Sequence, residues 1–235
     1  MLSAVGWGAL AASSLVLGAI LGVARSWSDG LVGAVLGFGA GALISSVAFE
    51  LAEEGLATSG PTEVAIGLAV GAAAYFLANR LVARIGGRSS RSTAGVPMAL
   101  GALLDGIPEQ AVLGIGLASG GGVGVALLVA IFVSNLPESI GSATAMRAAG
   151  EARRPILLLW LAVSVACALA TVVGYAVADV VGPSVRSGVD GFAAGALLVM
   201  LVDSMVPEAR EKAGDWAGLA TVLGFAVAAA LSKLA

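Results

Sequence analysis

Long apolar segments alternate with short polar gaps along the whole chain. Each segment has about 20 residues, the length that an α-helix needs to cross a bilayer. Runs such as 123–133 are continuously apolar rather than alternating, which argues against a membrane β-barrel. The pattern predicts an all-α, polytopic membrane protein with a single transmembrane domain, 1–235, because no gap is long enough for a soluble domain. The eight predicted spans are roughly 2–23, 30–51, 62–82, 95–117, 123–147, 155–179, 188–206 and 215–232.

The gaps between the spans contain the glycines, prolines and charged residues that are typical of loops. We expect the acids in and beside these gaps to be solvated loop charges: Glu53, Glu54, Glu63, Glu208 and Glu211. Tryptophan is enriched where membrane helices reach the interface. Four tryptophans fall near predicted span ends and are expected to be interfacial anchors: Trp7, Trp27, Trp160 and Trp216.

Composition agrees with this pattern. Hydrophobic residues make up 59% of the chain and charged residues 11%, whereas soluble domains have about a quarter charged residues. The mean hydropathy is +1.01. The net charge of −3 gives no reason to expect a nucleic-acid partner, and Cys167 is the single cysteine, so no intrachain disulfide forms. We therefore expect an integral protein of the cell (inner) membrane.

The basic residues are distributed unevenly between the two sides of the eight-span arrangement. Ten lie on one side, and Arg186 and Lys233 lie on the other. Because cytoplasmic loops carry the excess of lysine and arginine, the ten are expected to face the cytoplasm, with both termini outside. The ten are Arg25, Arg80, Arg84, Arg88, Arg91, Arg147, Arg153, Arg154, Arg210 and Lys212.

A short internal repeat links the second and seventh spans. Residues 37–44 (Gly-Phe-Gly-Ala-Gly-Ala-Leu-Ile) match residues 191–198 (Gly-Phe-Ala-Ala-Gly-Ala-Leu-Leu) at an offset of 154 residues, and acids follow both copies. The two spans run in opposite directions, and inverted repeats around a central site are typical of transporters. The alternative is that two helices rich in glycine and alanine resemble each other by chance.

The fourth and fifth spans each contain a proline followed by a glutamate near the middle: Pro108-Glu109 and Pro137-Glu138. A charge at this depth costs at least ~2.5–3.5 kcal/mol on insertion scales, so such residues usually have a function. Since two acids stand at matching positions, we expect a site between these spans. The structural alternative is that the prolines kink the helices and the acids are protonated or hydrogen-bonded.

Helical spacing predicts which side chains share this site. Residues four apart lie on one face, which pairs Asp105 with Glu109 and Ser134 with Glu138. Carboxylate, amide and hydroxyl oxygens suit a divalent cation. The candidate metal ligands are therefore Asp105, Glu109, Ser134, Asn135 and Glu138. The candidate residues of a pathway to the site are Met98, Glu50 and Asp203.

The motifs Asp105-Gly-Ile-Pro-Glu109 and Asn135-Leu-Pro-Glu138 resemble the paired proline–glutamate motifs in the fourth and fifth helices of the ZIP (Zrt/Irt-like) family of divalent-metal transporters. The resemblance implies eight helices, with helices 1–3 and 6–8 related as an inverted repeat around helices 4–5. By position, Asp105 stands where the family commonly has histidine, and Ser134 where it has histidine or glutamine. The chain would be a divergent, histidine-free, bacterial-type member.

The predicted function is transport of zinc, manganese or iron(II) across the cell membrane, with import into the cytoplasm expected. The lack of histidine should weaken the preference for zinc over harder ions. We expect neither enzyme activity nor a prosthetic group. An intramembrane protease is disfavoured because the chain has no His-Glu-x-x-His, no Gly-x-Gly-Asp pair and no Gly-x-Ser-x-Gly. The expected partners are divalent metal ions and the lipid bilayer, with a homodimer left open and no nucleic acid. The alternatives are a passive cation channel and a non-transporting membrane protein with a structural acid–proline core.

Overall fold

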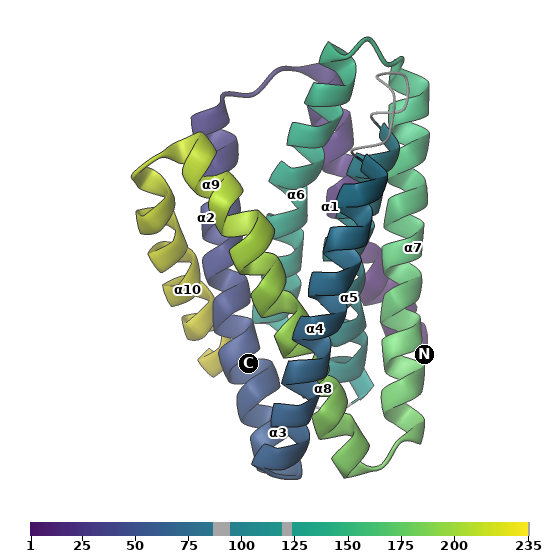
Figure 1. Ribbon diagram of the computed structural model, residues 1–235, viewed down its shortest axis with the longest axis vertical. Coiled ribbons are helices and arrows are strands. Elements are labelled where there is room, and N and C mark those ends of the chain that lie inside the picture. Colours follow the sequence, from purple (N-terminus) through teal and green to yellow (C-terminus); the bar gives the residue numbers. More distant parts are fainter. Residues whose placement is uncertain (87–94, 119–123, 235) are drawn as a thin grey trace.

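The computed structural model describes the backbone of residues 1–86, 95–118 and 124–234, and in this part every regular element is a helix (Figure 1). The all-α prediction is therefore confirmed for the described residues. The helices are α1 (Leu2–Ala24), α2 (Asp29–Ser46), α3 (Glu53–Thr58), α4 (Pro61–Gly86), α5 (Gly95–Ala118), α6 (Val125–Ala148), α7 (Arg153–Val180), α8 (Pro183–Met200), α9 (Val206–Ala213) and α10 (Trp216–Leu234), with two π-helices, η1 (Val47–Ala52) and η3 (Leu201–Met205).

Six helical segments of the described chain are long and apolar enough to cross a bilayer: Leu2–Ala24, Asp29–Thr58, Pro61–Arg84, Val125–Ala148, Arg153–Ala178 and Pro183–Ala213. Large apolar side chains also face outward, as a membrane requires. On α7 a row spaced three or four residues apart is about half exposed: Leu158, Leu161, Val165, Leu169 and Val173. The helices indicate a membrane-embedded protein. Helices α5 and α10 occupy the other two predicted spans, and the count of eight spans stays a prediction.

The second and seventh helical segments are longer than predicted. They continue through π-helical turns and short helices to Thr58 and Ala213, so the predicted ends at residues 51 and 206 and the loops after them are wrong. The segments end beside Gly60 and Gly214, whose φ angles are 108° and 58°. Glycine adopts positive φ without a steric penalty, which explains why the helical segments end there.

In two helix pairs, α2 with α10 and α4 with α8, the two helices approach each other closely at glycines. A Cβ atom on Gly41 of α2 would lie 1.8 Å from the carbonyl oxygen of Thr221 on α10. One on Gly195 of α8 would lie 2.1 Å from the carbonyl oxygen of Leu68 on α4. Small residues allow this approach between membrane helices. The Gly/Ala-rich stretches of α2 and α8 are thus packing surfaces, each with its own partner helix.

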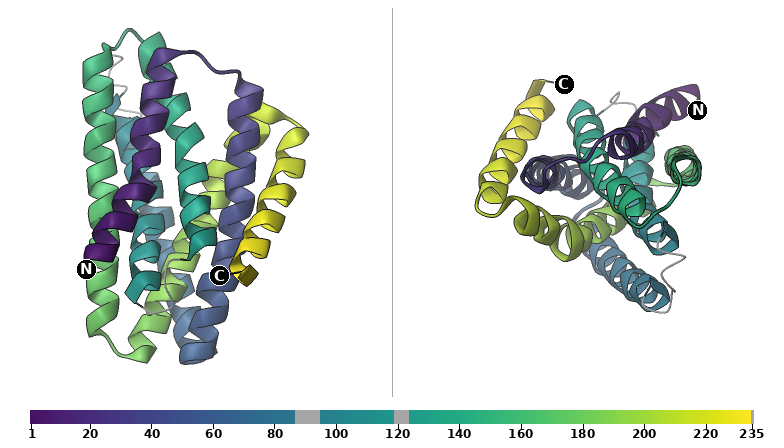
Figure 2. Two further views of the ribbon diagram at one scale, coloured as in Figure 1. Left: turned by 180° about the vertical axis from the view of Figure 1, so that it is seen from behind. Right: turned by 90° about the horizontal axis from the view of Figure 1, so that it is seen from above.

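The bundle has one group of four helices and two helix pairs. Helices α1, α5, α6 and α7 pack on one another, α2 packs along α10, and α8 along α4; α2 also contacts α6, and α5 contacts α8. The α1–α2, α6–α7 and α9–α10 connections lie toward one end, and both termini lie toward the other (Figures 1 and 2). The predicted site residues of α5 and α6 therefore have helices on several sides.

One tryptophan prediction is wrong. Trp160 is only 1% exposed and belongs to a buried cluster with Leu15 of α1 and Ile156 of α7. Its ring packs inside the bundle instead of lying at an interface, because it is on the side of α7 that faces α1. The exposed row that begins at Leu158 covers the outer side of the same helix.

Candidate functional site

The two prolines lie inside continuous helices, Pro108 in α5 and Pro137 in α6. A proline removes one backbone hydrogen bond and disturbs the carbonyl four residues before it. In both helices a glutamate follows directly. Glu109 is 1% exposed, and Glu138 is half-buried. The local sequence thus positions one carboxyl group from each helix inside the bundle.

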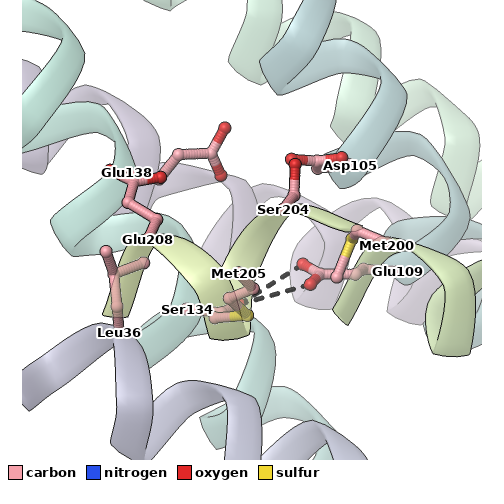
Figure 3. Close-up of a pocket in the computed structure, with 9 residues that line it drawn as sticks. All are labelled: Leu36, Asp105, Glu109, Ser134, Glu138, Met200, Ser204, Met205 and Glu208. Atoms are coloured by element: carbon pink, nitrogen blue, oxygen red, sulfur yellow. Dashed lines mark hydrogen bonds between the residues drawn. The ribbon is translucent and has the colours of Figure 1, made fainter. Parts of the chain in front are cut away.

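These carboxyl groups line a small cavity (Figure 3). Its volume is about 20 Å³, enough for one water molecule or one small ion. Four of the five predicted ligands line it, all except Asn135. The lining residues are Leu36, Asp105, Glu109, Ser134, Glu138, Met200, Ser204, Met205 and Glu208. The structure therefore brings together side chains from α2, α5, α6, α8, η3 and α9.

Hydrogen bonds hold two of the acids. The Tyr75 hydroxyl of α4 donates to Oδ1 of Asp105. The Ser134 hydroxyl lies 3.4 Å from both carboxylate oxygens of Glu109 and 3.0 Å from the carbonyl oxygen of Ile131. The Glu109 contacts are long for hydrogen bonds between oxygens. The Ser134 hydroxyl can therefore contact the carbonyl oxygen of Ile131 and another group in the cavity at the same time.

Positive charge is scarce around the cavity. Among the described residues, no basic side chain forms an ion pair with Asp105, Glu109 or Glu138, whereas the ammonium of Lys212 lies 2.6 Å from Oε1 of Glu208. Carboxyl groups inside a membrane are costly and usually face a polar interior or a ligand. Buried acids that have no basic partner and line one cavity mark a candidate functional site.

Asn135, Asp203 and Glu50 do not line the cavity. Asn135 is buried, and its side-chain nitrogen has no hydrogen-bond partner within the described part. Asp203 is exposed. Glu50, in η1, accepts a hydrogen bond of 3.0 Å from the Ser232 hydroxyl. The side chain of Met98 lies outside the described residues. The roles of these four residues stay predictions.

Sequence reasoning missed six residues at the site: Leu36, Tyr75, Met200, Ser204, Met205 and Glu208. The prediction that Glu208 is a solvated loop charge is wrong, because α9 continues the helix of the seventh span and brings this residue to the cavity. A signal was present, since Met200, Ser204 and Glu208 are spaced by four residues and so share one helix face.

A second polar pair lies next to the site. The Thr171 hydroxyl of α7 donates to Oε1 of Gln110 at 2.6 Å, and both residues are fully buried. Gly8 of α1 leaves room for this pair, since a Cβ atom there would lie 2.8 Å from Cβ of Thr171. The bond ties α5 to α7 directly beside Glu109. It therefore helps to fix the helix that carries two of the acids.

The cavity offers carboxylate and hydroxyl oxygens and two thioether sulfurs. Among the described residues, no three His, Cys, Asp or Glu side chains lie close enough together to hold a metal ion in this arrangement. The acids of α5 and α6 would have to move toward each other around a cation. Water would complete its coordination, as is common for hard divalent ions.

No family model matches the chain, and a search of the curated proteins finds no match to it.

Proposed function

We propose that this protein transports divalent metal cations, such as zinc, manganese or iron(II), across the membrane through the cavity between α5 and α6. One observation carries the proposal. Asp105, Glu109 and Glu138 line one cavity of about 20 Å³, and no basic side chain of the described part pairs with them. A cation would offset this charge, and the acids would replace part of its hydration shell.

The donor atoms at the cavity fit such a substrate. Carboxylates and the hydroxyls of Ser134 and Ser204 favour manganese and magnesium-like ions, whereas the thioethers of Met200 and Met205 favour softer ions. No imidazole is present, because the chain has no histidine. This mixed set of donor atoms supports binding of several first-row metals, with an affinity for zinc only slightly higher than that for manganese.

The packing of α2 and α8 supports the inverted repeat that the proposal includes. A Cβ atom on Gly224 of α10 would lie 1.9 Å from the carbonyl oxygen of Phe38, and one on Gly71 of α4 would lie 1.9 Å from that of Phe192. Phe38 and Phe192 occupy equivalent positions of the repeat at its offset of 154 residues. The same backbone contact therefore recurs in both pairs.

The π-helices agree with the same offset. They begin at Val47 and Leu201, which are also 154 residues apart. π-Helical turns are rare and occur frequently at functional sites. In one copy the turn carries Ser204 to the cavity, and in the other it contains Glu50, which accepts a hydrogen bond from Ser232 on α10. Repeats that flank a central site are a feature of transporters that open to each side in turn.

The orientation in this proposal follows the basic residues. Arginine and lysine residues concentrate in the connections α1–α2, α6–α7 and α9–α10, which lie toward one end of the bundle (Figure 2). By the positive-inside rule this end faces the cytoplasm. The proposal includes import into the cytoplasm.

Flux into proteoliposomes tests the proposal. Purified protein is reconstituted, and uptake of Mn²⁺ and Zn²⁺ is followed with an enclosed fluorescent chelator. We expect saturable uptake by the native protein, loss of most uptake in Glu109→Gln and Glu138→Gln, and normal uptake in Glu211→Gln, an exposed acid of α9. Non-saturating flux would favour the channel alternative. Normal saturable uptake in both cavity variants would place the site elsewhere.

A further inference from the structure

Lys212 extends from α9 to the edge of the cavity. Its ammonium lies 2.6 Å from Oε1 of Glu208, four residues earlier on the same helix. Glu208 lines the cavity together with Asp105 and Glu138. The Lys212 side chain is 22% exposed, and that of Glu208 is 41% exposed. The pair is thus partly withdrawn from solvent, unlike an ordinary surface ion pair along a helix.

Two glycines on neighbouring helices leave room for this lysine. A Cβ atom on Gly33 of α2 would lie 2.7 Å from Cβ of Lys212, and one on Gly141 of α6 would lie 3.0 Å from its Nζ. The side chain therefore runs from α9 past α2 toward α6. Gly141 follows Glu138 by three residues, about one helical turn. The ammonium accordingly lies beside Glu208 and one turn from a second acid of the cavity.

The neighbouring basic residue behaves differently. Arg210, two residues before Lys212, pairs with Asp215 at 2.8 Å, and the two side chains are 63% and 94% exposed. That pair is at the surface and has no contact with the cavity lining. Arg210 is therefore a matched comparison for Lys212 on the same short helix.

We propose that the ammonium of Lys212 is a tethered cation that competes with the transported metal ion for Glu208. This inference rests on the function proposed above. Like charges repel strongly in a poorly solvated site, so the metal and the ammonium exclude each other from Glu208. Lysine has a long flexible stem, which lets the ammonium move aside when a divalent ion arrives. Lys212 then determines how tightly the cavity holds its cation and keeps Glu208 paired when no metal is present.

Metal binding to detergent-purified, full-length protein tests this. The dissociation constant for Mn²⁺ is measured by isothermal titration calorimetry. Lys212→Met keeps an unbranched stem and removes the charge, and it should bind Mn²⁺ about tenfold more tightly than the native protein because a repelling charge is gone. Lys212→Arg and Arg210→Met should remain within about twofold of the native value. Lys212→Gln gives a second neutral variant in case Lys212→Met does not fold.

A second substitution separates competition from a structural effect. If Lys212 acts through Glu208, Glu208→Gln in the Lys212→Met protein should abolish the gain in affinity. Unchanged affinity in both neutral variants, alongside lost binding in Glu109→Gln, would overturn the role of Lys212 and leave the transport site intact. An absence of Mn²⁺ binding in the native and Lys212→Met proteins alike would overturn the proposed function itself, and with it this inference.

Discussion

The hydroxyl of Tyr75 donates a hydrogen bond to Oδ1 of Asp105, which joins α4 to α5 at the edge of the cavity. Tyr75 is only 3% exposed, so water cannot readily replace its hydroxyl. The tyrosine holds Asp105, the more exposed of the two predicted ligands on α5, in one orientation. It is thus a positioning residue for Asp105, supplied by a helix that the sequence motifs do not include.

We expect Tyr75→Phe to weaken metal binding about three- to tenfold, the equivalent of losing one ordinary hydrogen bond of about 0.5–1.5 kcal/mol. Helix packing should persist, because the ring is retained. Tyr175→Phe, on the chain's other tyrosine, is the control. The measurement is the apparent Michaelis constant for Mn²⁺ uptake in proteoliposomes. An unchanged constant in Tyr75→Phe would show that the orientation of Asp105 does not matter for binding.

Two adjacent residues of η3, Ser204 and Asp203, form a matched pair for substitution because only one of them lines the cavity. Ser204 lines the cavity, whereas Asp203 is exposed. We expect Ser204→Ala to weaken uptake by a few-fold, because one oxygen donor is lost at the cavity, and Asp203→Asn to have a smaller effect although it removes a charge. Initial uptake rates at limiting Mn²⁺ provide the measurement. The reverse result, with Asp203 important and Ser204 dispensable, would be incompatible with the orientation of the π-helix.

The position of Asp105 also predicts how a substitution there changes the selectivity between zinc and manganese. Imidazole favours zinc over manganese more strongly than a carboxylate does, so Asp105→His should raise the preference for zinc. The measurement is competition between Zn²⁺ and Mn²⁺ for uptake. Asp29→His, outside the cavity at the start of α2, is the control. If Asp105→His leaves the ratio unchanged, Asp105 does not contact the metal.

The glycine contacts predict a difference in stability. Gly41→Ala and Gly195→Ala each place a methyl group against a backbone carbonyl of the partner helix, at 1.8 and 2.1 Å before any shift. We expect each to cost about 1–3 kcal/mol or more, as overpacking does. Gly218→Ala has open space around it and should be neutral. Thermal unfolding in detergent measures the stability of the three variants. Equal stability of all three variants would contradict the close helix packing.

Much of the fold follows from local pattern. Apolar length predicted the helices, and the proline–glutamate pairs predicted that α5 and α6 carry acids to one place, where Asp105, Glu109, Ser134 and Glu138 now line a cavity. These were predictable because a helix fixes which side chains share a face.

The features that the sequence did not predict depend on contacts between helices and on irregular backbone. The π-helical turn of η3 and its continuation into α9 bring Ser204 and Glu208 to the cavity, and an α-helical period alone does not predict that turn. Tyr75 reaches Asp105 only because α4 packs beside α5. Trp160 looked interfacial by position, yet the rotation of α7 buries it.

We propose that Asp105, Glu109 and Glu138 together bind one divalent cation. The most direct test is anomalous diffraction at the manganese edge from crystals of the full-length protein grown with Mn²⁺. We predict one strong anomalous peak in the cavity, within coordination distance, about 2.0–2.6 Å, of carboxylate oxygens from both α5 and α6. Native crystals whose anomalous peaks all lie outside this cavity, or that show none at saturating Mn²⁺, would contradict the account.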